Sequence, residues 1–541
     1  MEEEDTTSAG ESTLSRRDVL VRGGQLAAGL AGAGALVGTA RASSRRILKT
    51  VPTGGNVTWA INQDPTALAP WGVLLEASHW GSEFMYDSLL GWDTHTNQVP
   101  ALAESWTVKD PRTVDFTLRK GVMFHNGQEM TAADVVYSIQ QQMNPPAPGS
   151  TGTLSFFPAI VGVSPMSKYV VRVKLAHPDA SLFGWFAWSR WSSIAPNNMY
   201  SQLNPVTQGI GTGPFKLVEY VPNDHITYQK WGQFWKKGLP YLDGITLKVI
   251  PDEQTAIAAL QAGALDGATV SAANAQALNG NSKVTVLKGQ TAGFYELQFT
   301  VKAGENKPWA DKRVRQAINM AINRDDMIQK VLAGQGQYSG HVPPGYGQWP
   351  LTQDQLKGTY QKYNVAGAQA LMKQAGFSSG FPATMHVVGT VATFTQIAQL
   401  LQSYVKQIGI DLSLQAEDGA TFSKAYATGN FDWLLNQRGI RGDVHGFVSE
   451  FNPGTSPNYN LWFNGYKNIL MWRLVGNGQI TLDPKKRLPM YRKLQQILLT
   501  ELLEIPLMVP YKYQVVSSRL KNMYVAYSDF NTGLRTDYIK S

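Results

Sequence analysis

Cysteine is missing from this chain of 541 residues. Its absence excludes disulfide bonds, cysteine nucleophiles, iron–sulfur clusters and thiolate metal sites. Charged residues are also sparse, because they make up 16% of the chain, while hydrophobic residues make up 43%. This composition is typical of a globular protein, and the length allows two or more domains.

Signatures of catalysis are missing as well. The sequence contains no G-x-S-x-G, no H-E-x-x-H and no Walker motif. Its eight histidines are scattered, and no two of them have the spacing of metal ligands on one helix. We therefore expect no catalytic activity, no metal site and no cofactor. A hydrolase whose catalytic residues come together from distant segments is the competing hypothesis.

The first 42 residues have the order of an export signal. A twin-arginine motif precedes a weakly hydrophobic run that is rich in Gly and Ala, and a small-residue cleavage pattern follows the run. The run is too short and too rich in glycine to span a membrane as a stable anchor. The assignment depends on four residues: Arg16, Arg17, Ala40 and Ala42. It predicts a twin-arginine signal peptide over 1–42 and a mature chain that starts near Ser43; the alternative is a disordered tail with an incidental arginine pair.

Removal of the signal raises the net charge from +8 to +10, because residues 1–42 hold four arginines and six acidic residues. The basic residues are interspersed, and the longest run of them is Lys485–Arg487. No basic stripe of the kind that binds nucleic acid is present. The charge favours solubility and gives at most a weak attraction for anionic solutes.

The stretch 101–140 carries the most local information. Apolar and polar residues alternate over 113–119, which predicts a half-buried strand. A turn at Asp110-Pro111 separates this strand from an earlier one, so we expect a hairpin. A T-x-x-D capping box at 131–134 predicts that a helix follows.

The amino-acid sequence of this stretch, AESW and then FTLRKGVMFHNGQEMTAADVVYS, closely resembles the corresponding segment of the extracellular solute-binding proteins of family 5. These are the dipeptide-, oligopeptide- and nickel-binding components of ABC importers. Similar agreement occurs at GTGPF in 211–215, at PYLDGI in 240–245 and at VRQAINMAINRDDMI in 314–328. The glycines of GTGPF lack the spacing of a dinucleotide fingerprint, so we interpret them as a chain reversal. The resemblance runs from about Gly55 to Tyr513.

The resemblance implies a mixed α/β chain with the bilobal fold of type II periplasmic binding proteins, in the large peptide-binding subclass. The expected domains are a first lobe at 43–302 with an inserted small domain at about 86–200, a second lobe at 303–504, and a return to the first lobe at 505–541. The resemblance further implies a monomeric binder, not an enzyme. Hinge closure is expected to trap a small, peptide-like solute and to present it to the membrane subunits of an ABC permease.

The missing cysteine bears on localisation once this resemblance is considered. Lipid-anchored binding proteins carry a cysteine at the mature N-terminus, and this chain has none. We therefore expect a free protein in a Gram-negative-type periplasm. Twin-arginine export implies that it folds before it crosses the membrane.

Hydrophobic periodicity predicts several further elements. We expect strands at 56–61, 169–175, 294–301, 411–415 and 505–516, and helices at 71–90, 311–334, 364–376, 395–409 and 482–503. The strand at 294–301 resembles one of the family's crossings between the lobes. The aromatic-rich stretch 182–188 is interpreted as core packing in preference to ligand contact, since large aromatic side chains are mostly buried.

The candidate ligand site follows the predicted strand that ends at about Leu435. In peptide-binding relatives an Asp shortly after a Gly-Trp pair binds the N-terminal ammonium of the peptide, and Asp443 matches it. Ile440 stands where those relatives carry Trp, and the arginine that dipeptide binders use for a C-terminal carboxylate has no counterpart in 390–394. Arg438 and Arg441 are then expected to meet an anion or to lie in solvent.

Two partners stay open for the carboxylate of Asp443, which is costly to bury unpaired. A ligand ammonium would make it a functional anchor, whereas Arg438 or Arg441 would make it a structural clamp. The candidate site thus consists of four residues: Asp443, Arg441, Arg438 and Ile440. Besides a peptide-like solute, an oligosaccharide, an opine and a metal chelate remain open as ligands.

Overall fold

The structure of the protein is a computed structural model. It describes residues 52–71, 76–93, 97–143, 160–291, 293–302, 304–454, 456, 458–525, 534 and 538–539, and residues 51–541 form one compact unit. The predicted signal-peptide residues Arg16, Arg17, Ala40 and Ala42 lie outside the described residues. No helix in the described ranges combines the length and the apolar character needed to cross a membrane.

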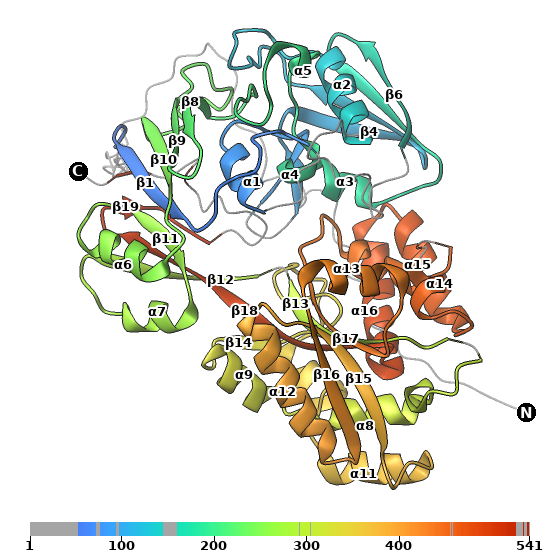
Figure 1. Ribbon diagram of the computed structural model, residues 1–541. Coiled ribbons are helices and arrows are strands. Elements are labelled where there is room, and N and C mark those ends of the chain that lie inside the picture. Colours follow the sequence, from blue (N-terminus) through green and yellow to red (C-terminus); the bar gives the residue numbers. More distant parts are fainter. Residues whose placement is uncertain are drawn as a thin grey trace, which may run out of the picture. The chain divides into compact units, whose positions relative to one another are not determined.

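A mixed sheet of twelve strands runs through the molecule (Figure 1). Its order is β16 (Ile410–Glu417), β15 (Phe381–Val388), β17 (Trp433–Arg438), β13 (Phe294–Phe299), β18 (Glu504–Ser517), β11 (Gly267–Val270), β1 (Asn56–Ile61), β10 (Gly244–Val249), β9 (His225–Lys230) and β8 (Phe215–Val221). Two further strands pair with β18: β12 (Val284–Gln290) and β14 (Gly336–Tyr338). The predicted strand 56–61 is confirmed at both ends, and the return strand 505–516 is confirmed as β18.

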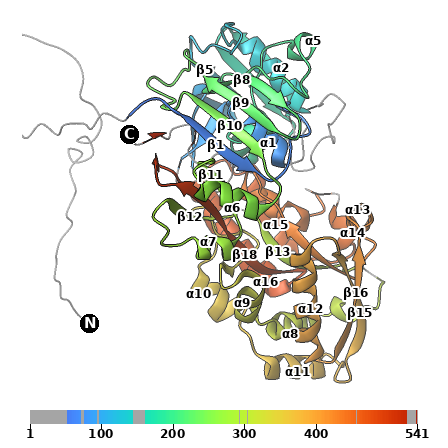
Figure 2. The same ribbon diagram turned by 60° about the vertical axis from the view of Figure 1, so that its left-hand side comes forward.

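Strand β18 belongs to both halves of this sheet (Figure 2). Residues 504–510 pair with β13 and β14, whereas residues 511–517 pair with β11 and β12. The side chains change partners at the same place, because Val509 packs in one apolar core and Val515 in another. We call the half with β1 and β8–β12 the first lobe, and the half with β13–β17 the second lobe.

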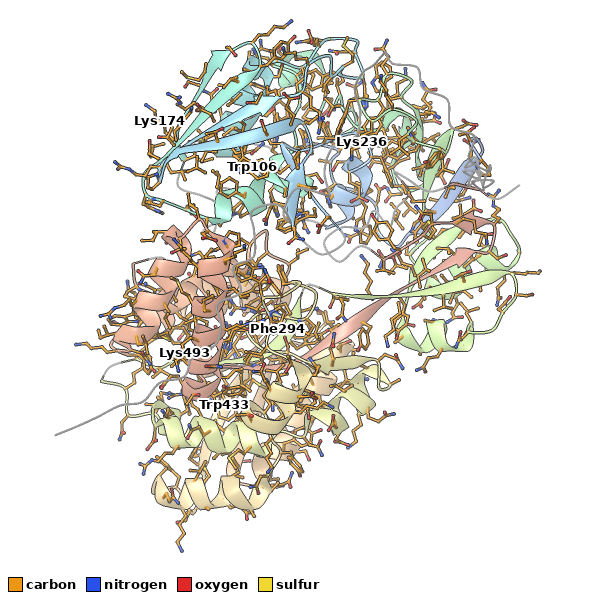
Figure 3. All side chains as sticks on the ribbon, turned by 180° about the vertical axis from the view of Figure 1, so that it is seen from behind. Trp106, Lys174, Lys236, Phe294, Trp433 and Lys493 are labelled. Carbon is orange, nitrogen blue, oxygen red and sulfur yellow. The ribbon has the colours of Figure 1, made fainter. Side chains whose placement is uncertain are left out.

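The chain passes from the first lobe to the second between β12 and β13. All six residues of β13 are buried, and the strand pairs with β17 and β18 in the second lobe. Figure 3 shows Phe294 and Trp433 among the side chains of this lobe, and both are fully buried. The predicted buried strand is therefore confirmed as β13, and its resemblance to a crossing between the lobes stays a prediction.

Helices cover the second lobe: α8 (Lys312–Ala321), α9 (Arg324–Leu332), α11 (Val365–Gln374), α12 (Ala392–Lys406), α13 (Gly419–Thr428), α15 (Ile469–Ile480) and α16 (Pro484–Glu501). The single helix predicted over 311–334 is two helices, α8 and α9. The side chain of Asn323 accepts a hydrogen bond from the backbone N–H of Asp326 and caps α9, so the first helix ends before it. The helices predicted near 364–376, 395–409 and 482–503 are confirmed as α11, α12 and α16.

In the first lobe the helix predicted over 71–90 is shortened to α1 (Glu76–Ser82). The GTGPF segment packs against the residues that follow α1, because the backbone N–H of Gly213 donates to the carbonyl of Met85 over 2.8 Å. A Cβ atom on Gly213 would stand 2.4 Å from the carbonyl oxygen of Phe84. This glycine therefore permits close approach of two chain segments, and the chain bends over 212–214, which agrees with the predicted change of direction.

A separate sheet of four strands has the order β4 (Ala103–Asp110), β5 (Thr113–Leu118), β7 (Val170–Leu175) and β6 (Ile160–Ser167), and we call the part of the chain around it the small domain. The predicted hairpin is the pair β4 and β5. The predicted helix is α2 (Ala132–Met143), whose residue Asp134 accepts a hydrogen bond from the backbone N–H of Thr131 over 2.8 Å. Residues between Leu89 and Ile194 form an apolar core of their own.

The remaining elements are short strands and helices outside the parts described above. They are β2 (Leu90–Trp92), β3 (Gln98–Pro100), α3 (Ser181–Phe186), α4 (Ser189–Ser192), α5 (Met199–Gln202), α6 (Glu253–Gln261), α7 (Ala272–Ala277), η1 (Pro308–Ala310), α10 (Gln353–Gln355), η2 (Leu356–Tyr360), η3 (Val444–Phe447), η4 (Ser449–Phe451), α14 (Asn458–Trp462), β19 (Leu520–Lys521) and β20 (Tyr538–Ile539). The segments that matter most below are α3, α4, η3 and α15.

Candidate functional site

The predicted site lies in the loop that joins β17 to η3, at residues 438–443. Arg438 is the last residue of β17, and Asp443 is the N-cap of η3. The side chain of Asp443 accepts a hydrogen bond from the backbone N–H of His445 over 2.8 Å. The loop is thus fixed at one end by the sheet and at the other by a capped turn.

Asp443 is paired with Arg487, a residue of the first turn of α16. Two guanidinium nitrogens of Arg487 lie 2.7 and 3.0 Å from the two carboxylate oxygens, and the two side chains are 5% and 8% exposed. Burial alone would raise the pKa of Asp443, but Arg487 and the hydrogen bonds hold it below its usual value. The structure therefore corrects the expected internal partner, which is neither Arg438 nor Arg441.

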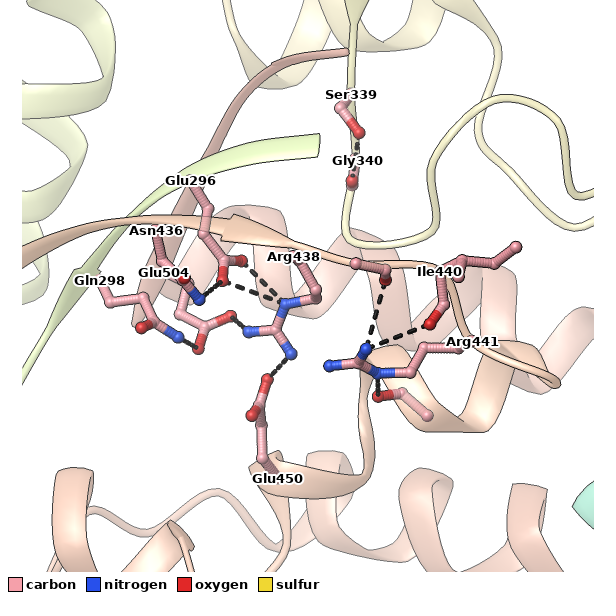
Figure 4. Close-up of polar contacts among 12 residues, drawn as sticks. Glu296, Gln298, Ser339, Gly340, Asn436, Arg438, Ile440, Arg441, Glu450 and Glu504 are labelled. Atoms are coloured by element: carbon pink, nitrogen blue, oxygen red, sulfur yellow. Dashed lines mark hydrogen bonds and ion pairs between the residues drawn. The ribbon is translucent and has the colours of Figure 1, made fainter. Parts of the chain in front are cut away.

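Arg438 is enclosed by three carboxylates (Figure 4). Its Nε atom lies 3.0 Å from Glu296, its Nη2 atom lies 2.8 Å from Glu504, and its Nη1 atom contacts Glu450. Burial opposes the charge of the guanidinium, yet Glu296 and Glu504 outweigh it and raise the pKa of Arg438. At 3% exposure this side chain is neither in solvent nor available to an anion, so that expectation is corrected.

The same cluster holds an excess of acid. Asn436 donates to Glu296 over 3.2 Å, and Gln298 donates to the second oxygen of Glu504 over 2.6 Å. Burial raises the pKa of Glu504 to about 8, while Arg438 acts against the rise. A carboxyl whose pKa is raised is more easily protonated, which lessens the repulsion among three acids around one arginine in a site away from water.

Arg441 holds the loop itself (Figure 4). Its guanidinium donates to the carbonyls of Gly439, Ile440 and Gly446 over 3.2 to 3.3 Å. Its backbone N–H donates to the hydroxyl of Tyr346 over 2.9 Å, and this hydroxyl donates back to the carbonyl of Arg441 over 2.7 Å. These hydrogen bonds hold the guanidinium to its own loop and to η3, and Ile440 is partly buried against the core of the second lobe.

A second network extends from Arg487 into α16. Arg487 donates to the hydroxyl of Tyr491 over 3.0 Å, and that hydroxyl lies 2.9 Å from Nδ1 of His445. Burial lowers the pKa of His445 to about 4, so its imidazole is neutral at pH 7. Arg487 and Tyr491 stand four residues apart on the face of α16 that also carries buried leucines. This spacing is the sequence signal that could have identified Arg487 as a buried residue.

The small domain contacts the second lobe next to this network. The backbone N–H of Ala180 donates to the carbonyl of Gln479 over 2.8 Å, and the side chain of Gln479 lies 3.4 Å from Asp179. A Cβ atom on Gly184 would stand 2.0 Å from the carbonyl oxygen of Gly442. The α3 segment and the predicted ligand loop therefore approach each other backbone to backbone.

The aromatic-rich stretch 182–188 divides between two environments. Leu182 and Phe186 belong to the core of the small domain, which confirms core packing for them. Trp185 and Trp188 are each 2% exposed, but neither is part of an apolar core formed by the described residues. Both rings are buried, as core packing predicts, and they contact each other and the ring of Trp191.

Metal binding has no evident place in the described part of the chain. No group of three or more His, Asp and Glu side chains there is arranged to hold an ion. The three acids that do come together are occupied by Arg438.

Comparison with known proteins identifies a family. The family model described as "Bacterial extracellular solute-binding proteins, family 5 Middle" matches residues 97–459. The glutathione-binding protein GsiB of Salmonella paratyphi A is 26% identical over 499 residues, which cover 86% of this chain and 91% of that protein.

Solved structures show the same fold. The periplasmic binding protein DppA of Helicobacter pylori, which is associated with an ABC transporter and was solved with the peptide STSA, matches with a TM-score of 0.71 and 23% identity. The match covers 91% of this chain and 99% of DppA. NikA of Brucella suis in complex with Fe(III)-EDTA matches with a TM-score of 0.75 and 22% identity over 90% of this chain and 100% of NikA.

Proposed function

Because the chain belongs to the bacterial extracellular solute-binding proteins of family 5, which bind and do not catalyse, we propose that it captures a peptide-like solute between its lobes for an ABC importer. The bilobal α/β fold agrees with solved binding proteins over about nine tenths of the chain. Within the family, the ligand of GsiB is glutathione and that of DppA is a short peptide. These relatives support a peptide-like solute for this chain.

The observation that carries the proposal is the sharing of β18 between the lobes. The described links between the two half-sheets are β18 itself and the passage from β12 to β13, and the hydroxyl of Thr291 bonds the carbonyl of Pro510 over 2.9 Å where they meet. Two adjacent strand segments of this kind can bend together as a hinge. We propose a first lobe at 43–302, a second lobe at 303–504 and a return at 505–541, with the bending centred near Thr291 and Pro510.

The remaining parts of the proposal concern the cell. We propose that the mature chain starts near Ser43, acts as a monomer in the periplasm after twin-arginine export, and delivers its solute to the membrane subunits of a permease. DppA, which is itself described as periplasmic, supports the compartment. The signal sequence supports the route.

A second candidate is a solute that is not a peptide. It is favoured by the ion pair with Arg487, which occupies the carboxylate of Asp443 that a peptide ammonium would need. NikA shows that the fold also accommodates a metal chelate. Oligosaccharides, opines and metal chelates are therefore the alternatives to be tested.

A panel of purified solutes tests the proposal. The mature protein is heated with peptides that include glutathione, and with oligosaccharides, opines and metal chelates. A solute that binds only the native state raises the melting temperature, and the stabilisation grows with the logarithm of one plus the ratio of its concentration to Kd. A rise with a peptide supports the first candidate, a rise with another solute supports the second, and no rise with any solute contradicts both.

A further inference from the structure

Three tryptophan rings lie at the contact between the small domain and the second lobe: Trp185, Trp188 and Trp191. Their ring centroids are 5.9 to 6.4 Å apart. Trp188 borders the predicted ligand loop, because a Cβ atom on Gly442 would stand 3.4 Å from its Cε3 atom. The rings therefore form an aromatic cluster beside residues 438–443.

Two of these rings have unused hydrogen-bond donors. The Nε1 atoms of Trp188 and Trp191 are buried, and neither has a hydrogen-bond partner among the described residues. An indole N–H can only donate, and a buried donor left unpaired costs about 1–3 kcal/mol. Two such donors lie on adjoining rings beside the predicted ligand loop, so they are available to a group with acceptor atoms.

His445 supplies a third donor from the other side of the contact. Arg487 can only donate, so the hydroxyl of Tyr491 accepts from it and is left to donate its own proton to Nδ1 of His445. This assignment places the imidazole proton on Nε2, which is buried and has no hydrogen-bond partner in the described part of the chain. His445 and Trp188 thus offer N–H groups from the second lobe and from the small domain.

The nearby acceptors are already used. Asp179 accepts hydrogen bonds from the backbone and the hydroxyl of Ser181 over 2.9 and 2.7 Å, and Asp443 is paired with Arg487. Arg190 adds a positive charge 5.2 Å from the ring of Trp191. Among the described residues, the region therefore has unpartnered donors on Trp188, Trp191 and His445, while the carboxylates of Asp179 and Asp443 already accept hydrogen bonds from other groups.

We propose that Trp188, Trp191 and His445 anchor a carboxylate, or another strongly accepting oxygen group, of the solute where the small domain meets the second lobe. The inference rests on the proposed function and narrows its substrate class to acidic, peptide-like solutes. The solute is held by its anionic end, and its ammonium, where it has one, is not bound by Asp443. The aromatic faces pack against the adjoining apolar part of the solute.

Ring-conserving variants test the anchor. Trp188→Phe and Trp191→Phe keep an aromatic ring and remove only the N–H group. Trp433→Phe is the matched control, because its Nε1 atom is also buried without a hydrogen-bond partner among the described residues, but it lies in the core of the second lobe. We expect each anchor variant to weaken glutathione binding about tenfold in calorimetry, equivalent to ~1.4 kcal/mol, and the control to bind like the wild type.

Indole N–H resonances in NMR give a readout that does not depend on knowing the natural solute. The mature protein is titrated with glutathione and, separately, with acetate at high millimolar concentration, with chloride as the ionic-strength control. We expect the resonances of Trp188 and Trp191, assigned with the two variants, to shift and saturate while that of Trp433 stays in place. Resonances that stay in place with both probes overturn the anchor.

The two proposals fail in different ways. A shift with acetate but no binding of any peptide supports the anchor and contradicts the peptide-like solute. Stoichiometric binding of glutathione without a shift, or an equal loss of affinity in Trp433→Phe, supports the solute class and overturns the anchor.

Discussion

Asp443 and Arg487 form a two-point ion pair in which two guanidinium nitrogens lie 2.7 and 3.0 Å from the two carboxylate oxygens. Both side chains are at least nine tenths buried. Removal of one member of such a pair leaves the other charge buried and uncompensated. The pair therefore holds the predicted ligand loop against α16 whether or not a solute is present.

Asp443→Asn should lower stability in the absence of any solute. We expect a loss of about 3 kcal/mol in the free energy of unfolding, as is typical when one member of a buried ion pair is removed. Denaturant titration measures it, and Asp354→Asn at an exposed position is the matched control. A variant that keeps its stability but loses affinity would instead show that the carboxylate serves a ligand ammonium.

Glu504 should make stability depend on pH between 6.5 and 8. Its pKa is raised from 4.5 to about 8 in the folded protein, so the folded state binds the proton more tightly than the unfolded state, and stability falls as pH rises toward 8. One proton gives a slope of at most ~1.4 kcal/mol per pH unit. Burial lowers the pKa values of His341 and His445 in the folded protein below the usual value of 6.5. Their effect is to raise the stability of the folded protein as pH rises to 6.5, and they change it little above that pH.

Glu504→Gln isolates this contribution. Arg438, Glu296 and Glu450 face the same carboxyl group, and the variant leaves them in place. We expect the difference in unfolding free energy between variant and wild type to change steadily from pH 6.5 to 8 in favour of the variant. A constant difference over that range would show that Glu504 is ionised throughout.

Gly184→Ala should hinder the approach of the small domain to the second lobe. Its new Cβ atom would stand 2.0 Å from the carbonyl oxygen of Gly442, so one of the two backbones has to move. We expect about tenfold weaker solute binding (~1.4 kcal/mol) and a smaller decrease in the radius of gyration on binding. Gly232→Ala, whose Cβ atom would meet nothing within 4 Å, is the control. Equal compaction in both variants would show that this contact is not part of closure.

Replacement of Arg16 and Arg17 by Lys should block export if the twin-arginine assignment is right. The two substitutions keep the positive charge, so a loss of periplasmic protein would reflect the arginine requirement of the route and not the charge of the segment. Cell fractionation and immunoblotting measure it. An unchanged periplasmic yield would contradict this export route.

Local sequence signals predicted much of the fold. The alternation in 113–119 and the capping box at 131–134 identified β5 and α2 correctly, because neighbouring residues determine strands and helix starts. The break between α8 and α9 was missed because both halves continue one apolar periodicity, and the cap formed by Asn323 competes with it. Whether such a cap interrupts a helix depends on tertiary packing, which hydrophobic periodicity does not report.

The site was predicted less well for a different reason. The loop at 438–443 was located correctly, but Arg487 lies 44 residues beyond its partner, and ion pairing across that separation leaves no periodic trace. Arg438 is surrounded by acids from β13, η4 and β18, which only the sheet brings together. Sequence reasoning can name the charged residues of a loop, but their partners depend on the tertiary arrangement.

Calorimetric titration of the mature protein, followed by mass spectrometry of the recovered solute, tests most directly whether this chain is a solute-binding component. The titration uses glutathione, the peptide Ser-Thr-Ser-Ala, representative oligosaccharides and opines, and metal chelates. We predict saturable binding of one peptide-like solute per chain and recovery of that solute unchanged. Multiple turnover of the solute, or the absence of binding across the whole set, would contradict this prediction.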